Sequence, residues 1–360
     1  MEMTTLPTLS SLGFSPFFEQ QLDDSIDERR IARVAAEHRG ACEVWSVTGV
    51  WPARIAGRFH RHNSHAPGVG DWVILRDAPA SDHPAIVERL FERRTLFTRG
   101  AAGRDARTQV VAANVDLVFA VTGLDADYNV RRLERYLARV YASGADPAVI
   151  LNKSDLCDDT RAATIEVESH CRNVPIVVTS ALSGEGIAAL RALIQEGMTV
   201  AFVGSSGTGK SSLINALLGD DLLTTATVRA SDGRGRHTTT HRQLIVLPDG
   251  GVVLDTPGMR ELQLLDDDGL TEVFDDIAEL SEQCRFRDCR HAGEPGCAVL
   301  AAAGDDVLMA ERLDHYHKLE REAEANELRH NVRLRRKADR IWGQLSDEVA
   351  LLRKWKGGKP

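Results

Sequence analysis

The stretch that decides the fold class is TVAFVGSSGTGKSSL, residues 199–213. Its apolar start, 200–203, predicts a strand, and Gly204, four intervening residues and then 209–211 (Gly-Lys-Ser) follow, which is the pattern of a phosphate-binding loop. Leucine and isoleucine recur at helical spacing from Leu213 onward, so the loop is expected between a strand and a helix. Glycines let backbone N–H groups curl around a phosphate, and the helix start adds a positive dipole end. The sequence therefore predicts a nucleotide-binding α/β domain.

The residues of this loop have separate expected roles. Lys210 is expected to bridge the β- and γ-phosphates, and the Ser211 hydroxyl to bind Mg²⁺. The remaining positions are expected to contact the nucleotide, chiefly through the backbone; they are Gly204, Ser205, Ser206, Gly207, Thr208, Gly209 and Ser212.

A base-reading motif, Asn152-Lys153-Ser154-Asp155, follows a predicted strand at 148–151. The Asp155 carboxylate can accept two hydrogen bonds from the N1–H and N2–H₂ edge of guanine, whereas adenine would leave it unpaired. Asn152 can meet the acceptor edge of the base, and the Lys153 stem can lie on its plane. Another predicted strand, 176–179, ends at Ser180-Ala181, where a tight turn can contact guanine O6. The motif favours a guanine nucleotide over the alternative of a phosphate-loop kinase or ATPase.

Two further motifs lie downstream of the phosphate loop. In Asp255-Thr256-Pro257-Gly258, the carboxylate can hold Mg²⁺ through water and the Gly258 N–H can sense a γ-phosphate. In 236–240 (Arg-His-Thr-Thr-Thr), Thr239 is the expected second Mg²⁺ ligand, although spacing does not separate it from the threonines on either side. Met259 stands where many GTPases have a water-orienting Gln, and a thioether cannot do that work. His237 is therefore the candidate catalytic residue; the alternative is a surface histidine without a role.

These motifs occur in a permuted order, with the base reader before the phosphate loop. In this order the chain resembles the circularly permuted GTPases and, with its flanking domains, the ribosome small subunit-dependent GTPase A (RsgA) family. The resemblance covers roughly residues 35–340. It implies a GTP hydrolase that is slow alone, is stimulated by the small ribosomal subunit and its rRNA, and acts in late assembly of that subunit. The resemblance also supports His237, because the family has His in the matching Gly-Arg-His-Thr-Thr stretch.

The domain boundaries follow from changes of pattern along the chain. Residues 1–35 read as an N-terminal extension, and period-two strands in 36–98 predict a small β-barrel, which the resemblance implies is an OB-fold. A linker at 99–114 is followed by the permuted GTPase domain at 115–265, a mostly helical zinc-binding domain at 266–345 and a tail at 346–360. Basic side chains of the barrel are either an RNA-facing surface or a solvated face; they are Arg54, Arg58, His60, Arg61, His62, Arg89, Arg93 and Arg94.

A compact metal motif lies in the predicted C-terminal domain. Cys284, Cys289, His291 and Cys297 fall within 14 residues, and three thiolates with one imidazole form a closed, structural type of zinc site. The alternative is four unrelated buried residues. The spacing resembles the zinc motif of the family, which implies one Zn²⁺ per chain.

Charge and composition bound the remaining possibilities. The formal net charge of −9 argues against indiscriminate nucleic-acid binding. The charge is uneven, because 266–282 is acidic while the helix predicted over 306–342 ends in a basic face suited to rRNA. With no apolar run of 18 residues, no secretion signal and few cysteines, we expect a cytoplasmic chain without a membrane span. A monomer is expected, and a non-ribosomal RNA-binding regulator switched by GTP is the alternative function.

Overall fold

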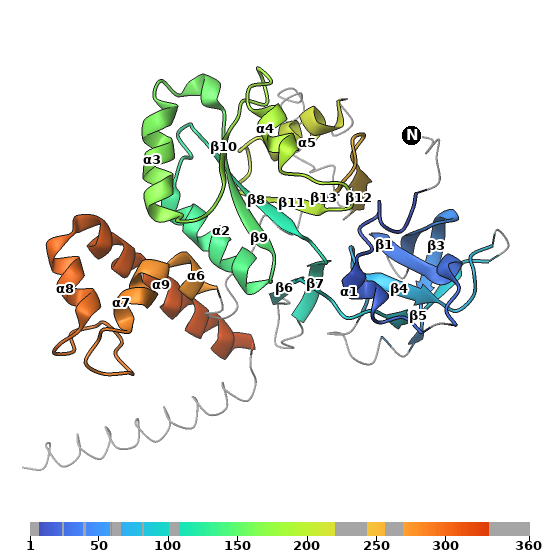
Figure 1. Ribbon diagram of the computed structural model, residues 1–360, viewed down its shortest axis with the longest axis horizontal. Helices are drawn as coiled ribbons and strands as arrows, with labels where there is room; N and C mark the ends of the chain where they lie inside the picture. Colours follow the sequence, from blue (N-terminus) through green and yellow to red (C-terminus); the bar gives the residue numbers. More distant parts are fainter. Residues whose placement is uncertain are drawn as a thin grey trace, which may run out of the picture.

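The computed structural model describes residues 7–23, 25–38, 41–57, 59, 66–80, 83–100, 108–219, 243–255 and 269–330. Figure 1 shows three parts in a row: a blue β-barrel at one side, a central α/β domain, and an orange helical region at the other side. The β-barrel, the α/β domain and the helical C-terminal part that the sequence predicts are all present (Figure 1).

The barrel contains five strands, which agrees with the period-two pattern in the sequence. They are β1 (Ile31–His38), β2 (Ala41–Ser46), β3 (Gly49–Ile55), β4 (Trp72–Leu75) and β5 (Ala85–Leu90). The antiparallel pairs β1–β2, β2–β3, β4–β5 and β1–β4 and the parallel pair β3–β5 close the barrel. Val34, Val44, Val73 and Val87 fill its interior.

The N-terminal extension is part of this barrel's packing. β1 starts at Ile31, inside the segment that the sequence assigned to the extension. Upstream of it, α1 (Pro16–Glu19) is a single turn, and Phe14 and Phe18 pack edge-on against Trp72 and Phe91. These rings bury a second apolar cluster against the barrel. The extension therefore covers one side of the barrel.

The segment expected to be a linker contains a strand. β6 (Leu96–Gly100) pairs with β7 (Thr108–Ala113) as an antiparallel hairpin. Residues 110–113, Val-Val-Ala-Ala, are buried, and this apolar run explains why the connector is ordered there. Part of the segment 99–114, predicted as a linker, thus forms strand β7.

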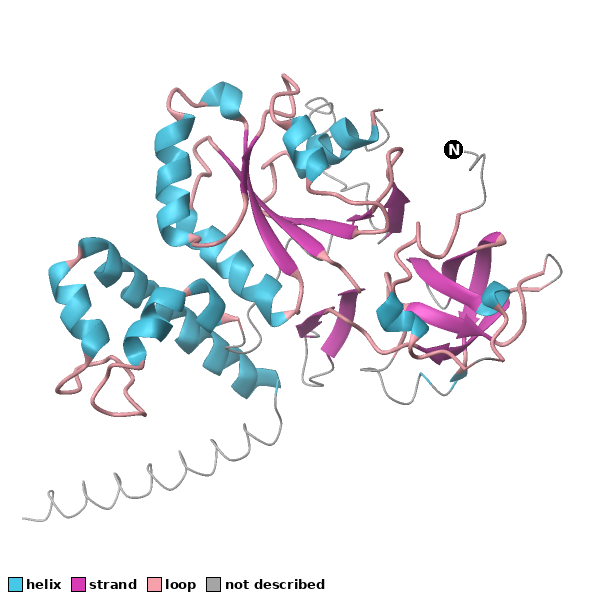
Figure 2. Ribbon diagram, viewed as in Figure 1, coloured by secondary structure: helices cyan, strands magenta, loops and turns pink. Residues whose placement is uncertain are grey.

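The central sheet has the strand order β10-β9-β8-β11-β13-β12, parallel except for β12–β13. Its strands are β8 (Leu117–Gly123), β9 (Asp146–Asn152), β10 (Ile176–Val178), β11 (Thr199–Val203), β12 (Gln243–Val246) and β13 (Val252–Asp255). Its helices are α2 (Val130–Ala142), α3 (Thr160–His170), α4 (Ile187–Ala192) and α5 (Lys210–Leu218). α2 and α3 cover one face and α4 and α5 the other, each over its own apolar cluster (Figure 2).

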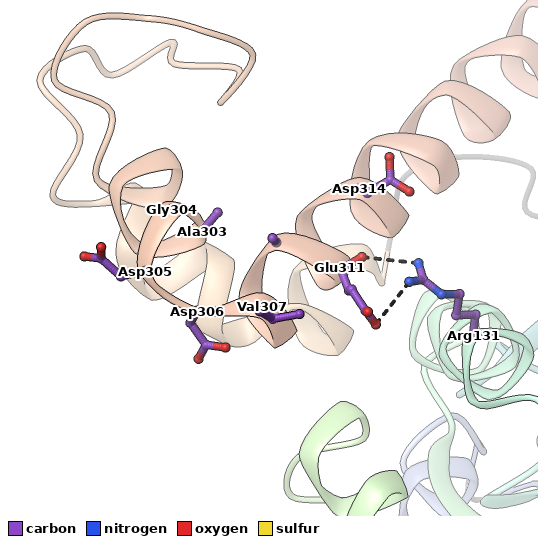
Figure 3. Close-up of a pocket in the computed structure, with 9 residues that line it drawn as sticks. Arg131, Ala303, Gly304, Asp305, Asp306, Val307, Glu311 and Asp314 are labelled. Atoms are coloured by element: carbon purple, nitrogen blue, oxygen red, sulfur yellow. Dashed lines mark hydrogen bonds and ion pairs between the residues drawn. The ribbon is translucent and has the colours of Figure 1, made fainter.

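The helical region packs against α2. It contains α6 (Leu270–Val273), α7 (Asp275–Ser281), α8 (Ala298–Asp305) and α9 (Val307–His330). Arg131 of α2 reaches Glu311 of α9 with a 3.4 Å ion pair across this contact (Figure 3). The basic residues expected at 333–340 lie outside the described part of the chain.

The acidic segment, for which the sequence offered no role, has a structural one in its described part. Asp275 pairs with Arg172 of the central domain, and Asp276 accepts two hydrogen bonds from Arg312. These acids therefore face arginines rather than an RNA surface.

Candidate nucleotide and zinc sites

The phosphate loop joins β11 to α5, as the sequence predicted. Gly204 has φ +148°, and a Cβ there would come within 2.3 Å of the Val121 carbonyl oxygen. Gly209 has φ +90°, and a Cβ there would lie 2.2 Å from Asn152 Nδ2. Both glycines are required because neighbouring strands approach the loop too closely for a side chain.

Lys210, the first residue of α5, is buried with its ammonium inside the curl of the loop. Nζ donates to the carbonyl oxygen of Gly204 at 2.7 Å and to that of Ser205. The Thr208 hydroxyl also donates to the Ser205 carbonyl, at 3.1 Å. The charge is therefore held at the place where the loop's N–H groups would surround a phosphate. Ser211 follows in the first turn of α5, where its hydroxyl could bind Mg²⁺ beside the phosphates.

Asn152 connects the base-reading motif to the phosphate loop and to the Ser-Ala turn. Its Nδ2 donates to the Thr208 carbonyl at 2.8 Å. Its Oδ1 accepts from the Thr179 hydroxyl at 3.1 Å and from the Ala181 N–H at 3.2 Å. Three motifs that are far apart in the permuted sequence thus meet at one buried amide, at the carboxyl ends of β9, β10 and β11.

The residues expected to read guanine lie around this amide. Asp155 is exposed, and its Oδ1 accepts a hydrogen bond from the Ser180 hydroxyl. Ser154 donates instead to Glu185, at 2.8 Å. A carboxylate oxygen accepts more than one hydrogen bond, so exposed Asp155 can also accept from a base N–H.

Lys153 makes a contact that the sequence did not predict. It adopts a left-handed φ of +66°, and its ammonium forms an ion pair with Asp125, just after β8. The hydrogen bond from Lys153 lowers the pKa of Asp125. The contact could have been expected, because Asp125 follows a predicted strand of the same sheet and the carboxyl ends of parallel strands share one edge.

The switch motifs are only partly within the described chain. Asp255 ends β13, the strand beside β11, so its carboxylate lies on the sheet edge that carries the phosphate loop. Gly258, His237 and Thr239 lie outside the described residues, and their roles stay predictions.

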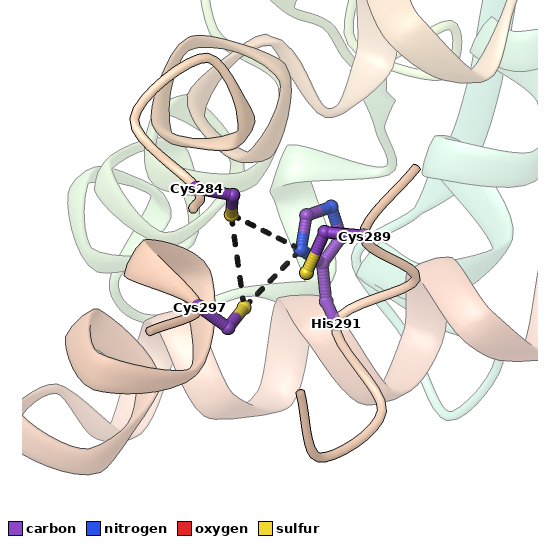
Figure 4. Close-up of side chains that lie close together, drawn as sticks. All are labelled: Cys284, Cys289, His291 and Cys297. Carbon is purple, nitrogen blue, oxygen red and sulfur yellow. Dashed lines mark hydrogen bonds between the residues drawn. The ribbon is translucent and has the colours of Figure 1, made fainter. Parts of the chain in front are cut away.

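The four expected zinc ligands lie together at the start of α8 (Figure 4). The sulfurs of Cys284, Cys289 and Cys297 and a His291 ring nitrogen all fall within 4.8 Å of one another. Cys284 and Cys297 Sγ are 3.8 Å apart, and His291 Nδ1 lies 3.7 and 3.3 Å from them. A tetrahedral zinc with Zn–S of about 2.3 Å and Zn–N of about 2.0 Å has ligand separations of about 3.8 and about 3.5 Å. The donor set therefore fits a closed zinc site.

Backbone N–H groups at the start of α8 favour the thiolate of Cys284, whereas burial raises the pKa of Cys289 to about 11. Cys297 caps α8, and its sulfur accepts from the Leu300 N–H at 3.3 Å. Burial raises the pKa of Cys284, but hydrogen bonds from the Val299 and Ala298 N–H groups outweigh it, so the pKa is lowered. A helix start stabilises the anionic form of cysteine that binds a metal.

The basic barrel residues that are described do not form one open surface. Arg93 is held by Asp71 in a nearly buried ion pair at 2.7 Å. Arg94 pairs with Asp116 at 3.0 Å, whereas Arg54 is exposed. Arg93 therefore has a structural role, and the interpretation as an RNA-facing residue does not suit it.

The sequence of this chain is similar to those of known GTPases. A family model described as RsgA GTPase matches residues 90–265. A "Small ribosomal subunit biogenesis GTPase RsgA" from Opitutus terrae is 48% identical and covers 88% of this chain and 89% of its own length. The one from Methanosarcina acetivorans is 43% identical, covering 90% and 88%.

Solved structures agree. The crystal structure of YjeQ from Thermotoga maritima matches with a TM-score of 0.62 and 26% identity, over 82% of this chain and 98% of that one. YloQ, titled a circularly permuted GTPase, matches with a TM-score of 0.59 and 26% identity, over 82% and 95%. A model described as ABC transporter also matches 188–348; this range includes the phosphate loop and leaves out the base-reading motif.

Proposed function

The chain belongs to the RsgA GTPase family and is a GTP hydrolase, and on that premise we propose that it acts on the small ribosomal subunit during late assembly. The observation that carries the GTP part is the meeting of base motif, Ser-Ala turn and phosphate loop at Asn152. The ribosomal part is supported by the relatives, which are small ribosomal subunit biogenesis GTPases by name.

We propose the following roles for this chain's own residues. Asp155 would accept the guanine N–H groups, and Lys210 would neutralise the β- and γ-phosphates. Ser211, Asp255 and Thr239 would hold the Mg²⁺ that accompanies GTP and draws charge from its phosphates. The loop's N–H groups would bind the phosphates, and the close neighbours of Gly204 and Gly209 leave no room for a side chain at either position.

We propose His237 as the residue that orients the attacking water. Met259 cannot do so, and His237 adjoins the switch threonines in the sequence. His237→Ala should lower subunit-stimulated turnover by about 10²–10³-fold while GTP affinity stays near wild type. A loss of affinity instead would make the histidine structural.

The RNA contact is proposed on the zinc-binding loop. Arg285, Arg287 and Arg290 are exposed there, and the Arg285 guanidinium lies 5.4 Å from the ring centre of Phe286, which is 40% exposed. Exposed arginine beside an exposed aromatic ring suits phosphate and base contacts. Zn²⁺ would hold this loop in shape.

Metal content tests the identity of that ion. The purified chain should contain one zinc per molecule, and Cys289→Ser should lose it. Cys42→Ser, which changes a buried cysteine of the barrel, is the matched control and should keep it. Another metal at one equivalent would contradict the zinc assignment.

GTP turnover with and without purified small subunits tests the function. We expect slow hydrolysis alone and a stimulation of at least tenfold by subunits. Tight GTP binding without stimulation would favour the alternative, a GTP-switched RNA-binding regulator.

The remaining parts of the proposal are a cytoplasmic location and a monomer. Within the described ranges, no helix combines the length and the hydropathy that crossing a bilayer requires. Sedimentation of the purified chain at micromolar concentration tests the monomer.

A further inference from the structure

Arg132 contacts the phosphate loop but belongs to none of the nucleotide motifs. It lies in the first turn of α2, where its N–H bonds to the Asn129 cap at 3.0 Å. Its Nη1 donates to the Ser205 hydroxyl at 2.5 Å and to Asp127 Oδ2 at 2.8 Å. A helix from another part of the sheet thus holds a side chain of the loop.

Ser205 is a sensitive point in the loop. Its carbonyl accepts the hydrogen bonds of Lys210 and Thr208, so its backbone sets where the lysine charge lies. Gly204 before it and Gly207 two residues later both have positive φ, so the local backbone has little intrinsic stiffness. The contact from Arg132 to the Ser205 side chain therefore restricts the conformation of the loop.

A polar chain links this contact to the base-reading motif. Lys153 pairs with Asp125, whose Oδ1 accepts from the Asp127 N–H at 3.0 Å, and Asp127 in turn binds Arg132. Asp125, Asp127 and Arg132 therefore link Lys153 of the base-reading motif to Ser205 of the phosphate loop, although none of the three belongs to either motif. The hydrogen bond to Asp127 also raises the pKa of Arg132.

We propose that Arg132 is a positioning residue for the GTPase reaction: it fixes Ser205, and with it the loop conformation that binds the nucleotide's phosphates. This inference rests on GTP hydrolysis and is independent of the ribosomal partner, so its test uses the chain without subunits.

The test compares GTP, GDP and guanosine binding in Arg132→Gln, Ser205→Ala and the double variant. Each single change should raise the Kd for GTP and GDP about tenfold, as expected for a lost charge-assisted hydrogen bond. The double variant should be no worse than either single one, because both remove one contact. Guanosine carries no phosphate, so its competition for the site should not change.

Arg131→Gln is the matched control. Arg131 is the neighbouring residue of α2 and pairs with Glu311 of α9 (Figure 3), so it should leave all three affinities at wild type. Arg132→Lys should restore part of the loss, since an ammonium can reach one partner but not make the same shared contact.

Three results would overturn the inference. The first is Kd values for GTP within twofold of wild type in Arg132→Gln. The second is full additivity of the two changes, which would mean that they act separately. The third is an equal loss for guanosine, which would indicate general damage to the domain.

Discussion

The central domain is attached to its two neighbours by different chemistry. On the barrel side, buried Arg33 donates to the carbonyls of Leu12, Gly70 and Asn114, and Ala113 N–H donates to the Val69 carbonyl. Most acceptors in this junction are backbone oxygens. Backbone oxygens do not titrate, and burial lowers the pKa of the donor Arg33 only to about 10. Apart from the Arg94–Asp116 ion pair, the barrel junction is therefore expected to depend little on pH below that value.

On the C-terminal side the contact is built from ionisable side chains. Glu134 of α2 is fully buried and binds His170 at 3.1 Å, Arg312 at 2.9 Å and His315. Arg312 also binds Asp276 at 2.7 Å and lies 5.0 Å from the Phe274 ring centre. One carboxylate thus joins the central domain to α9, which makes this junction the more sensitive of the two to charge.

Glu134→Ala should weaken the C-terminal junction most, while leaving the barrel junction intact. Removing the carboxylate leaves the buried Arg312 and two histidines short of an acceptor, which costs about 4 kcal/mol. Urea unfolding should show the loss, and hydrogen exchange should rise first in α9. Glu322→Ala is the matched control: Glu322 pairs with Arg135 in a partly exposed bridge, worth under about 1 kcal/mol. Equal effects would contradict the central role of Glu134.

Acid should act on the same junction. Burial alone raises the pKa of Glu134, but hydrogen bonds from His170 and His315 and the charge of Arg312 lower it from 4.5 to about 2. The folded pKa is below the unfolded one, so the stabilisation is complete above pH 4.5 and is lost as the pH falls toward 2. At most it amounts to about 3 kcal/mol.

Comparison with Glu134→Gln, which does not titrate, isolates this contribution. The difference in unfolding free energy between wild type and the variant should shrink between pH 6 and pH 3. A constant difference over that range would mean that Glu134 does not account for the acid response.

The stability of the barrel junction should instead be sensitive to added side-chain volume. Gly70 has φ +94°, and a Cβ there would lie 2.0 Å from the Ala113 carbonyl oxygen. Gly70→Ala should therefore cost about 1–3 kcal/mol more than Gly49→Ala. Gly49 has φ +119° but nothing within 4 Å, so it controls for backbone strain. Thermal unfolding measures both, and equal losses would show that the close approach is relieved cheaply.

Local patterns predicted most of the central domain. Short motifs with fixed spacing could be predicted from the sequence, because their chemistry depends on that spacing. They include the phosphate loop, Asn152 and the zinc ligands. β1 was missed because Ile31–His38 is rich in alanine and carries Arg33, which does not read as a buried residue.

Contacts that depend on the folded sheet could not be read in the same way. Asp125 and Arg132 meet Lys153 and Ser205 only after β8, β9 and β11 lie side by side. Glu134 and Arg312 are 178 residues apart, and each alone resembles a solvated charge on a helix. The acidic residues of α7, Asp275 and Asp276, likewise pair with arginines that are distant in the sequence, Arg172 and Arg312.

The register between β12 and β1 has a consequence for solubility. Ala36 of the barrel pairs with Gln243 of β12, and this one pair joins both domains into one eleven-stranded sheet and covers the start of an edge that would otherwise offer free backbone groups to another chain. At the far end the edge strand is β10, only three residues long, and short edges are poor templates for association. The barrel is therefore expected to reduce aggregation. A central domain expressed without the barrel should self-associate through β12.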